Sequence, residues 1–139
     1  MRKLFIALVL FAGSTVCQAR DMVVVLMNPQ APAVSLERND IADVLLGRRS
    51  MSLKGVTLVP IDTRDEALRE AFYQRIAKMS SNRVRAYWAR RVFSSQGRPP
   101  QELSVDEAAN LMLRDLSVLI YAFADRIPPG GQVLLQLEE

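Results

Sequence analysis

The chain has 139 residues, of which 50% are hydrophobic and 24% are charged, and its formal net charge is +3. This length and composition suit one domain with a packed core and argue against intrinsic disorder. The sequence has no histidine and a single cysteine, Cys17, which excludes a Ser-His-Asp or Cys-His triad, a disulfide within the chain and the usual tetrahedral zinc site.

Residues 1–19 have the pattern of a cleaved secretory leader. Arg2 and Lys3 are followed by an apolar run over residues 4–12, and then by small and polar residues that suit cleavage after Ala19. The apolar run is less than half of the about 20 residues that a membrane-spanning helix needs. We therefore expect a signal peptide and not a membrane anchor.

Cleavage removes 19 residues and two positive charges, which leaves 120 residues with a net charge of +1. One surplus charge provides no phosphate-neutralising surface, so no nucleic-acid partner is expected. The cysteine leaves with the leader, and a chain without cysteine suits an oxidising compartment, here the periplasm. Attachment of a lipid at Cys17 is the alternative fate of this segment.

The mature chain begins with a strand pattern. Residues 21–28 form an apolar, β-branched run without alternation, which is typical of a strand covered on both faces, as in parallel sheets. A short helix with an apolar stripe over residues 36–45 follows, with Ser35 as its cap and Gly47 after its last turn. Residues 56–61 predict the second strand.

Residues 63–79 give the longest helical signal, since apolar residues recur there at three- and four-residue steps. Residues 80–82, Ser-Ser-Asn, interrupt this helix and offer the cap of a further helix, whose apolar stripe includes Trp88. Ser104 and Glu107 have the spacing of a capping box, the most specific local signal in the chain.

The capped helix is expected to end near Arg114, and two more strands are predicted over residues 117–123 and 133–137. Strands that alternate with helices predict an α/β fold. We expect one domain over residues 20–139, a single-domain sandwich with a mainly parallel sheet.

Segments of the mature chain resemble the phosphate-binding-protein family of ABC importers, which has the type 2 periplasmic-binding-protein fold. Residues 40–48 are similar to the family's helix ending in "iFlGk", and residues 55–62 match its strand "G-x-x-l-x-P-v". Residues 68–72 match "lR-x-x-F", and residues 85–100 match "yW…F-x-G…PP". The likeness is closest to the small single-domain members. It implies a periplasmic-binding-protein-like lobe that binds a small oxyanion such as phosphate.

Two departures from the family pattern concern the ligand site. Ile120 stands where the family's "GaIGY" strand has the glycine before its tyrosine, here Tyr121. Residues 62–65 read Asp-Thr-Arg-Asp, whereas the large members carry a Ser-Gly-Thr phosphate loop at this place. Only Thr63 offers a hydroxyl there. The two aspartates disfavour a second anion unless one of them accepts a proton from it.

We expect an anion site where Thr63 and Arg64 open the long helix, because free amides and the helix dipole favour negative charge there. Asn28, after the first strand, and Tyr121, at the end of a later strand, would complete the site. Each residue also has a structural alternative: a cap for Thr63, a solvated side chain for Arg64 and simple packing for Tyr121. No metal and no cofactor are expected.

Several other residues have a structural and a functional interpretation. The arginines between residues 83 and 91 either form a solvated face or dock an anionic partner, such as a phospholipid head group or an acidic protein. For Trp88 and Tyr87, a role in the core is favoured over stacking on a ligand. Capping explains Asp106 and Glu107 better than acid–base chemistry does.

The sequence thus predicts an exported, non-enzymatic solute-binding-like protein for phosphate or a similar small oxyanion, with a membrane importer as a candidate partner. Proteins of this fold enclose their ligand between two lobes, and 120 residues supply about one. The alternative is an envelope protein–protein interaction module that keeps the fold without a ligand site.

Overall fold

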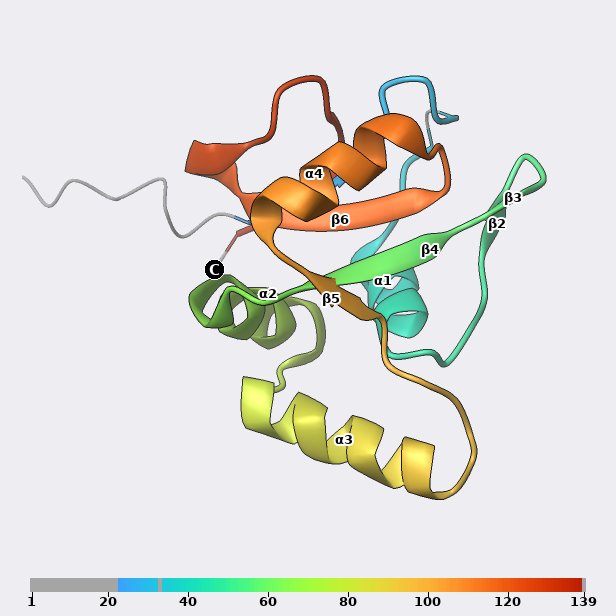
Figure 1. Cartoon of the computed structure of the whole chain (residues 1–139), viewed down its shortest axis with the longest axis vertical. Coiled ribbons are helices and arrows are strands. Elements are labelled where there is room, and N and C mark those ends of the chain that lie inside the picture. The colour runs from blue at the N-terminus through green and yellow to red at the C-terminus, as the bar shows by residue number, and fades with distance from the viewer. Residues whose placement is uncertain (1–22, 33, 139) are drawn as a thin grey trace, which may run out of the picture.

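A five-stranded sheet with the strand order β5-β4-β6-β1-β7 forms the centre of the protein, and β2 and β3 form a separate hairpin (Figure 1). The structure is a computed structural model that describes residues 23–32 and 34–138; the predicted leader lies outside them. The strands are β1 (Val23–Met27), β2 (Ser52–Leu53), β3 (Val56–Thr57), β4 (Val59–Thr63), β5 (Gln101–Leu103), β6 (Val118–Phe123) and β7 (Gln132–Leu137). The helices are α1 (Arg38–Leu45), α2 (Glu66–Ala77), α3 (Ser81–Phe93), α4 (Val105–Arg114) and the 3-10 helix η2 (Ala124–Arg126).

Four of the five described strands of the central sheet run in one direction. β4 pairs in parallel with β5 and β6, whereas β1 pairs antiparallel with both β6 and β7. The predicted α/β sandwich with a mainly parallel sheet is therefore confirmed. The apolar run over residues 21–28 was compared with strands of parallel sheets, and this is wrong for the direction of β1. A strand that is buried on both faces has the same apolar run whether its neighbours are parallel or antiparallel.

Helices cover both faces of the sheet (Figure 1). On β1, Val25 and Met27 belong to the larger core, which α1 and α2 cover, whereas Val24 and Leu26 belong to the smaller core under α4. This division follows from the alternation of side chains along a strand. Within the described residues, no helix is long and apolar enough to cross a bilayer.

The helix starts agree in part with the sequence analysis. The capping box of α4 is confirmed, and within the predicted cap stretch over residues 80–82 it is Ser80 that caps α3. The first helix begins after Glu37 and not after Ser35, and the long helix begins after Asp65, two residues beyond Thr63. An aspartate is among the best N-cap residues, so it outcompetes a threonine two positions earlier.

Two strand predictions also differ from the structure. The predicted strand over residues 56–61 is divided because residues 56–57 pair with β2 in the hairpin that turns at Gly55, at φ 83°, whereas β4 pairs with β5 and β6 of the central sheet. Strand β5 has no counterpart in the sequence analysis. Its three residues carry no apolar alternation, and β4 recruits them by backbone pairing.

The C-terminus of α1 is packed against α3. Gly47 has φ 64°, the left-handed conformation that was expected after the helix. Trp88 is buried against it, and the hydroxyl of Tyr87 donates a hydrogen bond to the carbonyl of Leu46 at 2.6 Å. These contacts explain why Trp88 and Tyr87 belong to the packing of the domain.

Candidate functional site

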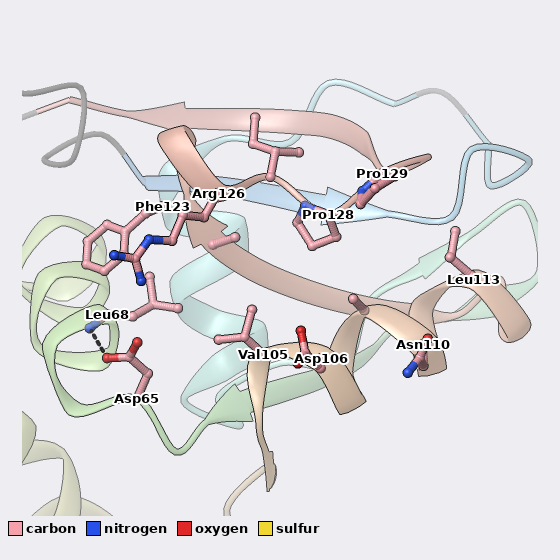
Figure 2. A pocket seen from close by; sticks show the side chains of 13 residues that line it. Asp65, Leu68, Val105, Asp106, Asn110, Leu113, Phe123, Arg126, Pro128 and Pro129 are labelled. Atoms are coloured by element: carbon pink, nitrogen blue, oxygen red, sulfur yellow. Dashed lines mark hydrogen bonds between the residues drawn. The ribbon is translucent and has the colours of Figure 1, made fainter.

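A cavity of about 850 Å³ opens between α4, the carboxyl end of β6 and the amino end of α2 (Figure 2). In open α/β sheets, ligands bind outside the carboxyl ends of the strands, which is where this cavity lies. Its lining consists of Asp65, Leu68, Val105, Asp106, Ala109, Asn110, Leu113, Ala122, Phe123, Arg126, Ile127, Pro128 and Pro129. The cavity is therefore the first candidate for a small-molecule site.

Polar groups of both charge signs meet in this cavity. Arg126 extends from η2 toward the side on which Asp65 lies, and Asp106 and Asn110 face the cavity from α4 (Figure 2). Within the described part of the chain, the side chains of Arg126, Asp106 and Asn110 have no hydrogen-bonding or ion-pair partner. One cation, one carboxylate and one amide are thus available to a ligand that carries both acceptors and a donor.

The amino end of α2 is closed by its own residues. The carboxylate of Asp65 accepts a hydrogen bond from the amide of Leu68 at 3.1 Å. The amide of Asp65 in turn donates to the hydroxyl of Thr63, also at 3.1 Å. An aspartate at this place supplies the negative charge that the helix terminus favours.

Thr63 and Arg64 are also engaged within the protein. Thr63 is buried, and its amide donates to the carboxylate of Asp62 at 2.8 Å. The amide of Arg64 donates to the carbonyl of Leu103 at 3.0 Å, and its guanidinium lies 3.2 Å from the carboxylate of Glu107. An anion bound by this turn would have to replace such bonds. The ligand role of Thr63 and Arg64 stays a prediction.

Asn28 lies apart from the other predicted site residues. It follows Met27, which pairs with Leu119 near the start of β6, so the antiparallel β1 carries it to the end of the sheet opposite Thr63. Its side-chain amide donates to the carbonyls of Met112 and Leu113 at 3.0 and 3.1 Å. Asn28 thus holds the last turn of α4 and does not join the expected anion site.

Tyr121 lies in the core and not on the wall of the cavity. Its ring stacks on Phe72, with centroids 3.8 Å apart, and its hydroxyl donates to the carboxylate of Asp62. Burial first, and then the negative charge of Asp62, raise the pKa of Tyr121 well above its usual value. The structure therefore shows a packing role for Tyr121, and its ligand role stays a prediction.

A buried polar network surrounds Asp62 on β4. Its carboxylate also accepts a hydrogen bond from the hydroxyl of Tyr73 at 3.0 Å and lies 3.3 Å from the guanidinium of Arg69. Arg69 reaches Glu102 on β5 as well, at 3.2 Å. Burial lowers the pKa of Arg69, but the two carboxylates outweigh it and the pKa lies above its usual value. The network joins β4, β5, β6 and α2 beside the carboxyl ends of the parallel strands.

The amino end of α4 is likewise satisfied by the protein's own side chains, and the strand beneath it is filled by an apolar residue. Ser104 and Glu107 satisfy each other's backbone amides at 2.9 and 3.2 Å. The hydrogen bond from the Ser104 amide to the Glu107 carboxylate is the main cause that lowers the pKa of Glu107. Ile120, in place of the family's glycine, is buried in the smaller core. No group of side chains that could hold a metal ion occurs in the described residues.

Sequence reasoning missed Arg126, Asn110 and the network around Asp62. Arg126 follows the strand 117–123 directly, and an arginine just after a buried strand is the signal that could have pointed to it. Asn110 is an exposed position on α4 and carries no such signal. The pairing of Arg69 with Asp62 could not be predicted from the sequence, because the two residues are seven positions apart, on either side of the turn into α2.

Comparison with solved structures finds similar folds at low sequence identity. A protein from Clostridium perfringens that is assigned as a phosphate ABC transporter substrate-binding protein, solved with bound phosphate, aligns with a TM-score of 0.56 and 11% identity over 81% of this chain and 43% of its own. An ABC-type phosphate transport receptor from Vibrio cholerae aligns with a TM-score of 0.56 and 8% identity over 81% and 44%, respectively. No family model and no curated protein matches the sequence.

These comparisons define the class of fold. The chain is an α/β lobe similar to those of periplasmic binding proteins, with one antiparallel strand, β1, inside an otherwise parallel sheet. It spans less than half the length of either of these two structures.

Proposed function

We propose that this protein is an exported, non-enzymatic solute-binding-like protein whose open cavity receives a small protonated oxyanion such as phosphate. The observation that carries the proposal is the cavity at the carboxyl end of β6, where the side chain of Arg126 has no partner among the described residues and faces the same space as Asp65 and Asp106. The phosphate bound in the Clostridium perfringens structure supports the same ligand class for this fold.

The charges in the cavity favour an oxyanion that keeps a proton. The guanidinium of Arg126 would pair with the charged oxygens, and the side-chain amide of Asn110 would donate one more hydrogen bond. Asp106 accepts hydrogen bonds only, so it binds a P–OH group but repels a fully deprotonated oxygen. Phosphate near neutral pH carries at least one proton and sulfate carries none, so the cavity would prefer phosphate.

Affinity would be low, because the open cavity leaves one side of the ligand in water. We expect a Kd of about 1 mM, the weak end of specific binding. A membrane importer or an envelope protein that covers the cavity would supply the missing side and tighten binding.

Calorimetric titration of the purified protein tests the proposal, with sulfate as the comparison ligand. Arg126→Ala removes the cation and should weaken phosphate binding by about tenfold or more, since a hydrogen bond to a charged group contributes about 1.5–3 kcal/mol. Arg98→Ala, in the loop before β5, makes the same charge change at another exposed arginine, which has no side-chain partner within the described residues, and should leave binding unchanged. No heat at about 10 mM phosphate would contradict the proposal.

One specific observation favours the second candidate, an envelope interaction module that has kept the fold without a ligand site. The amino ends of α2 and α4 are both satisfied by their own side chains, and Ile120 fills the position of the family's glycine. The exposed apolar rim at Leu113 and Ile127 would then meet a partner protein. Photo-crosslinking in intact cells from position 127, with exposed position 98 as the control, tests this candidate.

A further inference from the structure

The outward face of α3 carries apolar and small side chains that nothing in the described chain covers. Phe93, the last residue of the helix, has 94% of its surface exposed, and Val92 has 50%. Asn82, Ala86, Ala89 and Phe93 follow one another at steps of four and three residues, so they share one face of the helix. All four are exposed. A phenylalanine at this exposure, aligned with small residues, indicates a surface that meets another apolar medium.

Arginines border this face, and α3 contains no acidic residue. Arg83 and Arg90 are seven residues apart, two helical turns, and therefore lie on the same side of the face. Both are exposed, and within the described chain neither side chain has a hydrogen-bonding or ion-pair partner. Arg85 borders the opposite side and pairs with Glu66 of α2. The face thus presents an apolar strip beside two free positive charges.

The remaining arginine of the helix, Arg91, has a structural role on the inner side. Its guanidinium lies over the rings of Tyr87 and Trp88, 5.5 and 5.7 Å from their centroids. It also donates to the carbonyl of Gly47 at 3.1 Å. The residues that face the body of the protein therefore fix the helix in place and leave the outward face rigidly presented.

We propose that the outward face of α3, defined by Ala86, Ala89, Phe93, Arg83 and Arg90, docks this protein on a bilayer surface rich in anionic phospholipids. An interfacial helix places its apolar side chains at the boundary between head groups and acyl chains, with cationic side chains at the head-group level. Phe93 enters that boundary, and the two arginines bind the phosphate groups of neighbouring lipids.

The shape of the face favours a lipid surface over an acidic protein. In Figure 1, α3 forms the lower end of the molecule, on the side of α2 away from the sheet, and α4 lies toward the other end. A stable protein interface buries about 800 Å² on each partner, whereas this strip is one aromatic ring and two alanines on a protruding helix. A bilayer deforms around such a protrusion. Docking through α3 would also leave the cavity beside α4 open.

Vesicle co-sedimentation tests the proposal. The purified protein is mixed with vesicles of phosphatidylglycerol and phosphatidylcholine, and with vesicles of phosphatidylcholine alone. We expect binding to the anionic vesicles only, and a loss of binding in about 0.5 M salt, where screening reduces the attraction of exposed charges. Equal binding to both kinds of vesicle, or no binding to either, would overturn the proposal.

Two variants locate the contact. Arg83→Ala combined with Arg90→Ala should reduce partitioning by about 25-fold, since each arginine near an anionic surface contributes about fivefold. The control Arg38→Ala combined with Arg114→Ala changes the net charge equally on other elements. Its partitioning should differ from that of the unaltered protein by no more than about twofold, the small effect expected from overall charge. Equal losses in both double variants would contradict docking through α3.

The aromatic contact has its own control. Phe93→Ser should reduce partitioning by about tenfold, because the ring no longer enters the boundary region. Val133→Ser removes an apolar side chain that is 39% exposed on β7 and should have no effect. Binding to soluble poly-glutamate without binding to anionic vesicles would replace the lipid by an acidic protein partner and overturn the proposal. Since Phe93 is exposed, neither outcome can be confused with unfolding.

Discussion

The guanidinium of Arg69 lies 3.3 Å from the carboxylate of Asp62, and both side chains are almost fully buried. The carboxylate also accepts hydrogen bonds from Tyr73 and Tyr121, so a single aspartate on β4 organises side chains from α2 and β6. A buried charge of this kind is tolerated only when it is paired and hydrogen-bonded. The network therefore stabilises the end of the sheet beside the candidate site as long as all its members are present.

Arg69→Met should destabilise the protein strongly, because it leaves the carboxylate of Asp62 buried without a compensating cation. We expect the free energy of unfolding in urea to fall by about 3–5 kcal/mol. Arg49→Met is the matched control. It breaks an ion pair with Asp40, at 2.6 Å, that is largely solvent-exposed, and such pairs contribute less than about 1 kcal/mol. Equal losses in the two variants would contradict the assigned role of the network.

Stability should decrease at alkaline pH. Burial, followed by the charge of Asp62, raises the pKa of Tyr73 and Tyr121 in the folded protein. In the unfolded chain both hydroxyls titrate near pH 10. Above that pH the unfolded state binds fewer protons than the folded state, so the free energy of unfolding falls as pH rises, by up to about 1.4 kcal/mol per pH unit for each tyrosine. Below about pH 10 the contribution is complete.

Unfolding measured between about pH 8 and 11 checks this dependence, with tyrosinate absorbance as the direct readout. Tyr121→Phe should remove part of the slope above pH 10. Tyr87, whose hydroxyl bonds to the Leu46 carbonyl outside this network, provides the control variant Tyr87→Phe. A slope that is the same in both variants would mean that Tyr121 is not the group that titrates.

The burial of β1 could be predicted from the sequence, but the direction of this strand could not. Its apolar run predicted burial on both faces, and all five residues are buried. Direction left no trace in that pattern, and the antiparallel pairing moved Asn28 to the opposite end of the sheet from Thr63. Hydrogen bonds between residues close in the sequence could be predicted more accurately than the direction of a strand. The capping box of Ser104 and Glu107 needs only side chains three residues apart, and it is present as expected.

Gly47 should be more sensitive to substitution than a glycine with a similar backbone. Gly47→Ala places a methyl group 2.8 Å from Cη2 of Trp88 and also strains a residue at φ 64°, whereas Gly55→Ala at φ 83° meets no atom within 4 Å. The strain is common to both, about 1–2 kcal/mol, so overpacking should cost Gly47→Ala about 1–3 kcal/mol more. Urea unfolding followed by the fluorescence of Trp88, the sole tryptophan, measures the difference. Indistinguishable midpoints would show that Trp88 can move aside freely.

The cap of α4 offers a smaller effect at the edge of the candidate site. Ser104→Ala removes the acceptor for the Glu107 amide and should lower the free energy of unfolding by about 1 kcal/mol. The exposed Ser50 has no hydrogen bond in the described chain, so Ser50→Ala should be neutral. The pKa of Glu107 is lowered in the folded protein chiefly by the hydrogen bond from the Ser104 backbone amide, which this variant keeps. The stabilisation linked to Glu107 is present above its unfolded pKa and is lost as pH falls through the folded value, so it should largely remain in Ser104→Ala. A loss no larger than that of Ser50→Ala would contradict the assigned cap.

The candidate site itself was harder to derive than the fold. A helix after a strand offers free amides, which predicted an anion site at Thr63 and Arg64. The carboxylate of Asp65 satisfies that helix terminus instead, because it accepts a hydrogen bond from the amide of Leu68. The available groups of the cavity, Arg126 and Asp106, come from segments 20 residues apart that only the tertiary fold brings together. Helix-terminal patterns are local, whereas a cavity is a property of packing.

Backbone amide chemical shifts can show whether the cavity between α4 and η2 binds a small protonated oxyanion. Phosphate is titrated into ¹⁵N-labelled protein, with sulfate at equal ionic strength as the control. We expect saturable shifts confined to residues 105–110 and 124–127, which Arg126→Ala abolishes and sulfate does not reproduce. Shifts absent from these two segments, or equal shifts with sulfate, would contradict it.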